Sequence, residues 1–207
     1  MALRSRTKPI DQRVKLAANA GLTLYVAPRS VLSDWLRLVL AEKEVEDARV
    51  ETVLPGKPHE DFLVLNPAHV LPAACDREGV WLGARVIAEY LDERYPHPPL
   101  MPAAPAGRAR VRMALAAFEQ ELVPLLDGPP NDPVRGERLR RLREAARRIP
   151  AQGWLLGREY TLADCAWAAL LHGMEAQGFA SSPANEALTR YAARLRARPA
   201  YQRCFEQ

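Results

Sequence analysis

Hydrophobic residues recur with two different spacings, and the change of spacing divides the chain into two parts. The first part alternates β-prone runs with helical patterns. It predicts strands over 22–26, 48–53, 70–75 and 80–82, and helices over 31–43, about 59–65 and 84–94. The second part contains long helical patterns over about 105–126, about 133–148, 161–177 and 184–197. The sequence therefore predicts a mixed α/β domain followed by an all-α domain.

The order of elements in the first part, β-α-β-α-β-β-α, is that of a thioredoxin-like domain. The strand–helix–strand unit over 22–53 predicts two parallel strands. The turn Asp76-Arg-Glu-Gly79 predicts an antiparallel hairpin. Pro72 begins the third strand, where a proline disturbs no ladder bond. In thioredoxin-like folds this proline is usually cis, so we expect a cis bond before Pro72.

Composition suggests where the domains begin and end. Residues 1–21 carry five basic side chains against one acidic side chain, which is typical of a flexible arm. A stretch rich in proline and alanine follows residue 95. We therefore expect a thioredoxin-like domain over 22–95, a proline-rich linker over 96–104 and a helical domain over 105–207.

The clearest start signal in the second part lies at Thr161. The run Thr161-Leu-Ala-Asp164 places a hydroxyl at the N-cap and a carboxylate three residues later, which is close to a capping box. We interpret this motif as structural, because it begins the helix that is expected to lie in the core of the helical domain.

The bulk composition is that of a soluble globular protein, with 48% hydrophobic and 26% charged residues. No apolar run reaches the roughly 18 residues needed to span a bilayer, and no secretory signal begins the chain. The cysteines Cys75, Cys165 and Cys204 are scattered, which argues against a disulfide framework and against a metal site. We expect a cytoplasmic protein without a membrane or a metal.

Charge is distributed unevenly. Residues 22–95 hold 8 basic and 13 acidic side chains, whereas residues 96–207 hold 16 basic and 11 acidic ones. The segment from Arg135 to Arg148 contains seven arginines but no aromatic residue and no nucleic-acid-reading motif. We interpret it as a solvated helix face or a contact for an acidic partner, and we do not expect direct binding of nucleic acid.

The stretch from Glu89 to Pro102 reads Glu-Tyr-Leu-Asp-Glu-Arg-Tyr-Pro-His-Pro-Pro-Leu-Met-Pro. Together with Leu36-Arg-Leu-Val-Leu-Ala-Glu-Lys43, Leu65-Asn-Pro67 and Tyr160-Thr-Leu-Ala-Asp-Cys165, it closely resembles the stringent starvation protein A family. The resemblance implies a glutathione-transferase fold, a homodimer and association with bacterial RNA polymerase holoenzyme. In that family the Pro-His-Pro neighbourhood is an exposed patch needed for action with the polymerase, which here corresponds to Pro96, His97 and Pro98.

The same resemblance allows the alternative of a glutathione enzyme to be tested. The residue that stabilises the thiolate would be Ser30, although a serine that opens a helix is commonly an N-cap. The pair that holds the glutamyl carboxylate, often Glu-Ser in relatives, is here Gly83-Ala84, and neither side chain forms a hydrogen bond. Each lost contact costs roughly 1–3 kcal/mol. Only the backbone of Leu71 beside Pro72 is left to hold a peptide, so we expect weak glutathione binding or none, and no cofactor.

These observations lead to three hypotheses of function. The leading one is a non-catalytic regulator that binds RNA polymerase under starvation or stress through Pro96, His97 and Pro98, a segment that otherwise serves as a stiff linker. The second is a glutathione S-transferase-like enzyme acting through Ser30. The third is a partner-sensing module, such as a heterodimer subunit or a nucleotide binder.

Overall fold

The first part of the chain forms a four-stranded sheet with the order β2-β1-β3-β4. The computed structural model describes residues 21–57, 60–126, 133–178 and 186–206, so the expected arm over 1–21 lies outside the described residues except for its last one. The strands are β1 (Thr23–Val26), β2 (Arg49–Thr52), β3 (Ala73–Asp76) and β4 (Gly79–Leu82). β1 runs parallel to β2 and β3 is antiparallel to β4, which confirms the two predicted pairings, and β3 also pairs antiparallel with β1.

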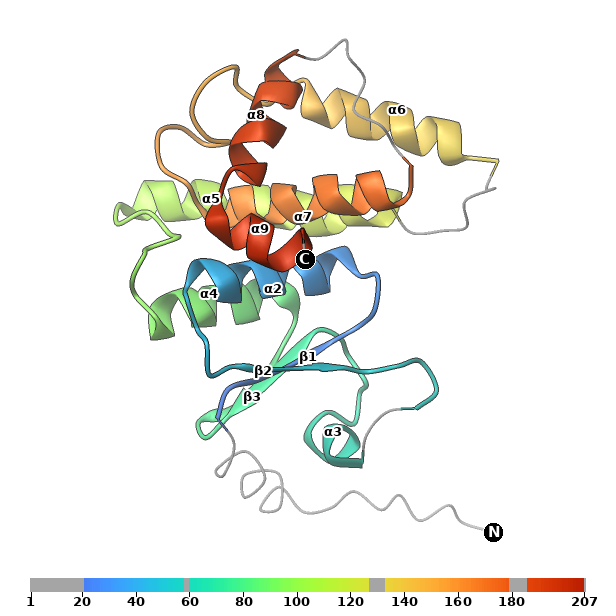
Figure 1. Cartoon of the computed structure of the whole chain (residues 1–207), viewed down its shortest axis with the longest axis vertical. Helices are drawn as coiled ribbons and strands as arrows, with labels where there is room; N and C mark the ends of the chain where they lie inside the picture. The colour runs from blue at the N-terminus through green and yellow to red at the C-terminus, as the bar shows by residue number, and fades with distance from the viewer. Residues whose placement is uncertain (1–20, 58–59, 127–132, 179–185, 207) are drawn as a thin grey trace.

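Helices cover both faces of this sheet. They are α2 (Val31–Glu42), α3 (Glu60–Leu65) and α4 (Ala84–Arg94). α2 and α4 lie between the sheet and the helical domain, whereas α3 lies on the opposite face (Figure 1). Trp35, Leu36 and Val39 of α2 are completely buried. Because α2 contacts both the sheet side and the helical domain, it is hydrophobic around much of its surface.

The helical domain follows the predicted patterns with two differences. Its elements are α5 (Pro105–Ala117), the π-helical turn η1 (Phe118–Leu122), the 3₁₀ turn η2 (Val123–Leu125), α6 (Arg135–Ala146), α7 (Leu162–Ala176), α8 (Glu186–Arg196) and α9 (Pro199–Phe205). The helix predicted over 105–126 ends its regular α-helical part at Ala117 and continues through the π turn into the 3₁₀ turn, which contains Pro124, a residue without an amide hydrogen for an α-helical bond. The short helix α9 was not predicted. None of the helices in the described ranges is long and apolar enough to cross a bilayer.

The predicted capping box at the start of α7 is confirmed. The Ala163 amide donates to the Thr161 hydroxyl at 3.3 Å, and the Thr161 amide donates to Asp164 Oδ2 at 2.9 Å. Asp164 is fully buried and also accepts hydrogen bonds at Oδ1 from the Leu155 amide (2.8 Å) and the Tyr191 hydroxyl (2.7 Å). This single carboxylate therefore joins the loop before α7, the first turn of α7 and α8.

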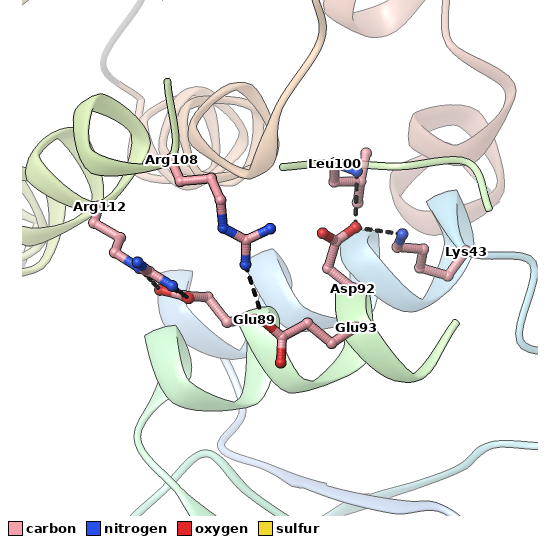
Figure 2. Close-up of polar contacts among 7 residues, drawn as sticks. All are labelled: Lys43, Glu89, Asp92, Glu93, Leu100, Arg108 and Arg112. Carbon is pink, nitrogen blue, oxygen red and sulfur yellow. Dashed lines mark hydrogen bonds and ion pairs between the residues drawn. The ribbon is translucent and has the colours of Figure 1, made fainter. Parts of the chain in front are cut away.

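Charged residues of α4 connect the two domains. Glu89 accepts a bidentate pair of hydrogen bonds from Arg112 of α5, and Glu93 accepts one from Arg108 at 2.9 Å (Figure 2). These contacts place α5 beside α4. Both pairs are partly exposed, so they contribute more to the orientation of the two helices than to the free energy of unfolding.

Candidate functional site

Three loops with candidate residues of the glutathione pocket meet at one edge of the sheet. In the strand register Tyr25 lies opposite Ala73, and Ala73 lies opposite Leu82. β1 and β4 therefore end at the edge where β3 begins. The segments that follow or precede these residues contain Ser30, the Leu71-Pro72 bond and Gly83-Ala84, so the topology gathers all five candidate residues there.

Ser30 is the N-cap of α2. Its hydroxyl oxygen accepts a hydrogen bond from the Ser33 amide at 3.3 Å, which is the ordinary capping contact. The neighbouring Ser33 is completely buried and accepts a hydrogen bond from the Ala27 amide at 3.0 Å. Both hydroxyl groups thus have structural contacts that hold the turn between β1 and α2. The capping contact alone explains why a serine stands at position 30, with no need for a bound thiolate.

The bond between Leu71 and Pro72 is cis, as predicted, and Pro72 is buried at the start of β3. The loop before it is held by Asn66, whose side chain donates to the Val70 carbonyl at 2.6 Å and accepts from the Val70 amide at 3.3 Å. This backbone arrangement, which an extended peptide would need, is therefore in place.

Gly83 has a backbone geometry that suits glycine and no other common residue. Its φ angle is +88°, in the region where L-residues are strained, and it precedes the first residue of α4. A glutamate in the same conformation would be strained there. Glycine at position 83 avoids this strain, but it also lacks a side chain that could contact a ligand.

The N-terminus of α4 holds a carboxylate from the protein itself. Glu119 of η1 accepts a hydrogen bond from the Arg85 amide at 3.2 Å, and its other oxygen lies 3.7 Å from Arg85 Nε. A helix N-terminus attracts anions, and this one is next to Gly83-Ala84, where a glutamyl carboxylate would bind. Glu119 could not be predicted as part of the pocket, because nothing in the local pattern of η1 indicates which helix Glu119 faces.

The positive φ of Gly83 predicts opposite changes in the free energy of unfolding for two glycine-to-alanine substitutions. Gly83→Ala is expected to lower the free energy of unfolding by about 1 kcal/mol, since alanine disfavours a positive φ. Gly136→Ala, within α6, is expected to raise it by up to about 1 kcal/mol, since alanine is the better helix former. An added Cβ meets no atom within 4 Å at either position, so crowding does not confuse the comparison. Urea denaturation measures the free energy of unfolding of both variants. Equal changes in the two would show that the backbone at Gly83 is not strained by alanine.

The Pro96-His97-Pro98 segment lies far from this pocket. All three residues are exposed, and the His97–Pro98 bond is cis. The segment is held against Lys43, the C-cap of α2, whereas Ser30 caps the other end of the same helix. A 12-residue helix is about 18 Å long. The structure thus separates the two candidate sites by the length of α2.

Some arginines of the basic segment over 135–148 are buried or form ion pairs within the protein. Arg138 is buried, and Arg140 pairs with Glu137 at 2.7 Å and with Glu144 at 3.2 Å along α6. These pairs are typical of a solvated helix face.

Comparison with known proteins agrees with this geometry. The pattern of the family "Glutathione S-transferase, N-terminal domain" matches residues 24–99, and that of the "Glutathione S-transferase, C-terminal domain" matches residues 130–199. A solved glutathione S-transferase from Sinorhizobium meliloti 1021 superimposes with a TM-score of 0.78 at 24% identity, over 91% of this chain and 93% of that one. The fold is therefore that of a glutathione transferase, with a thioredoxin-like N-terminal domain and a helical C-terminal domain.

Sequence relatives define the family more narrowly. The stringent starvation protein A homolog of Pasteurella multocida (strain Pm70) is 36% identical over 181 residues, which cover 84% of this chain and 85% of that protein. The homolog of Coxiella burnetii (strain RSA 493 / Nine Mile phase I) is 37% identical over 72% of this chain and 74% of its own length. The chain belongs to the stringent starvation protein A family.

Proposed function

We propose that this protein is a non-catalytic transcription regulator that associates with bacterial RNA polymerase holoenzyme under starvation or stress. The observation that carries the proposal is the exposure of Pro96, His97 and Pro98 on a segment whose backbone is anchored to a buried lysine. Prolines limit the conformations of the free segment, so a partner that binds it orders little chain. The histidine adds a donor, an acceptor and a flat ring.

The arrangement around the glutathione pocket supports the non-catalytic part of the proposal. Ser30 caps a helix, Gly83-Ala84 offers no hydrogen-bonding side chain, and Glu119 places a negative charge where a carboxylate ligand would bind. We therefore propose weak or absent binding of glutathione. The alternative of an enzyme acting through Ser30 has only the backbone at Leu71-Pro72 in its favour, because Ser30 already serves as a helix cap.

We also propose a cytoplasmic homodimer. Leu82 of β4, Val86 of α4 and Met113 of α5 are large apolar residues that are 40%, 54% and 72% exposed. β4 and α4 follow each other in the chain, and Arg112, the residue before Met113, pairs with Glu89 of α4. Exposed apolar side chains on neighbouring elements are suited to burial between two copies related by a twofold axis.

The test replaces Pro96, His97 and Pro98 with alanine. Capture of the protein by immobilised RNA polymerase holoenzyme is expected to fall at least about tenfold, because the free segment then samples more conformations and loses the imidazole. The substituted residues are exposed, so the variant should stay folded and keep the dimer mass of the wild type in light scattering.

A matched control removes another exposed proline and histidine, by Pro67→Ala together with His69→Ala. This variant should bind the polymerase like the wild type. Equal capture of the triple-alanine variant and the wild type would defeat the assignment of the binding segment. Failure of the wild type to bind at all would defeat the proposed function.

A further inference from the structure

The segment that carries His97 is anchored by a buried cluster of polar groups. Lys43, whose side chain is 0% exposed, forms an ion pair with Asp92 of α4 and donates a hydrogen bond to the Pro98 carbonyl at 2.5 Å. The same Asp92 oxygen accepts a hydrogen bond from the Leu100 amide at 2.7 Å (Figure 2). The backbone is thus held on both sides of Pro99. The Leu100 carbonyl also accepts from the Leu162 amide at 2.9 Å, which links the segment to the start of α7.

A second buried charge, next to Lys43 in the sequence, anchors the neighbouring surface. Glu42 accepts two hydrogen bonds from Arg198, at 2.6 and 2.7 Å. The Arg198 guanidinium carbon lies 3.6 Å from the centre of the Tyr160 ring, a cation–π contact. Burial raises the pKa of the Tyr160 phenol well above its ordinary value, so this ring stays neutral at physiological pH.

These two anchors define the walls of one cavity. A hollow of about 480 Å³ is lined by Pro98, Pro99 and Met101 of the proline segment and by Tyr160 and Arg198 of the helical domain. Lys43 holds the proline wall and Glu42 holds the wall of the helical domain. The end of α2 therefore fixes the position of the proline segment relative to the helical domain.

We infer that the buried Lys43–Asp92 pair is a positioning device that keeps Pro96-His97-Pro98 in the conformation recognised by the polymerase. This inference rests on the proposed function. A buried ion pair is rarely more stabilising than a well-packed apolar pair of similar volume, because both ions lose their hydration. Here the two ions also bind the Pro98 carbonyl and the Leu100 amide, two groups that apolar side chains cannot hold. The ions therefore act through the two backbone groups that they hold more than through their mutual attraction.

The test is the double substitution Lys43→Met with Asp92→Leu, which replaces both ions with apolar side chains of similar length. The thermal midpoint should fall, because the buried Leu100 amide and the Pro98 carbonyl lose their partners, but the variant should still fold because both ions are removed together. Hydrogen exchange of the Leu100 amide, measured by NMR, should accelerate at least about tenfold because its acceptor is gone. Capture by immobilised RNA polymerase holoenzyme should fall at least about tenfold, although Pro96, His97 and Pro98 are unchanged.

Two further variants separate positioning from a general structural role. Lys43→Met with Asp92→Asn keeps an oxygen for the Leu100 amide and leaves no buried charge without a partner, so it should retain most of the protection from exchange and more of the capture than the apolar variant. Glu93→Ala with Arg108→Ala removes a more exposed ion pair between α4 and α5 and should change neither measurement. The Lys43→Met, Asp92→Asn variant also serves as the test if the apolar double variant does not fold, since capture equal to that of the wild type would overturn the inference, because the Pro98 carbonyl has lost Lys43.

The outcomes distinguish the inference from the function on which it rests. Normal capture by the folded double variant, together with lost capture by His97→Ala, would overturn the positioning role and keep the polymerase function. Unchanged exchange of the Leu100 amide would overturn it as well. If the wild type is not captured, the polymerase function fails. The exchange measurement then still decides whether the pair holds the segment.

Discussion

Replacing Asp164 with alanine is expected to lower the free energy of unfolding by roughly 4 kcal/mol. The carboxylate is fully buried and accepts hydrogen bonds from the amides of Leu155 and Thr161 and from the Tyr191 hydroxyl. Alanine leaves all of these donors without an acceptor in a place that water does not reach. Each unsatisfied buried donor costs about 1–3 kcal/mol, partly offset because the buried charge disappears as well.

The loss should also be cooperative, because the donors belong to different elements. Leu155 lies in the loop before α7, Thr161 caps α7, and Tyr191 is a completely buried residue of α8. α7 in turn packs on α2, so its first turn supports the contact between the two domains. A domain of ordinary stability, about 5–15 kcal/mol, would lose a large fraction of it through this one side chain.

Urea denaturation of the two proteins measures the difference. Glu60→Ala is the control, since Glu60 is a carboxylate in the first turn of α3 but is exposed, and its loss should change stability by no more than about 0.5 kcal/mol. Tyr191→Phe removes one donor and should cost about 1 kcal/mol, which tests the same network if the alanine variant does not fold. A loss below about 1 kcal/mol for Asp164→Ala would mean that water or a rearranged loop replaces the carboxylate.

The start of α7 illustrates what a sequence reveals about this fold. Thr161 and Asp164 are three residues apart, so their contact is dictated by helix geometry and could be predicted. The bonds from Asp164 to Leu155 and Tyr191 depend on how the loop and α8 pack, and no local pattern encodes them. Similarly, α9 is only seven residues long, too short for a hydrophobic period, and its one local signal is Pro199 at the first turn.

The same distinction applies to the candidate sites. Ser30 as a cap was predictable from its position before a helix, and the cis bond before Pro72 was predictable from the thioredoxin-like order of elements. Lys43 and Asp92 stood in the quoted family stretches, but only the folded chain shows that they meet. Glu119 gave no signal, because its partner Arg85 lies in the other domain, 34 residues away in the chain.

The second prediction with a large effect concerns the glutathione pocket. Ala84→Ser combined with Glu119→Gln is expected to raise the affinity for glutathione roughly 100-fold. The serine hydroxyl supplies a hydrogen bond to the glutamyl carboxylate at the N-terminus of α4. The glutamine keeps an oxygen for the Arg85 amide, but it removes the negative charge that repels the ligand. Each change is worth about 1–2 kcal/mol, so the two together give the expected factor.

Gly83 is left unchanged in this design for a physical reason. Its φ of +88° means that glutamate, the residue of the family pair, would strain the backbone and lower stability. Serine at position 84, by contrast, adds a single oxygen to a side chain that begins a helix with no side-chain cap. The design thus restores ligand contacts while keeping the relaxed backbone of this chain.

Calorimetric titration with glutathione measures the affinities of the wild type, the two single variants and the double variant. Glu121→Gln is the control, because Glu121 lies in the same turn as Glu119 but is exposed and should not affect the pocket. If Glu119→Gln alone brings no gain, the carboxylate does not occupy the ligand's place. Micromolar binding by the wild type would instead favour the enzyme acting through Ser30, because Gly83-Ala84 would then be compatible with a functional glutathione site.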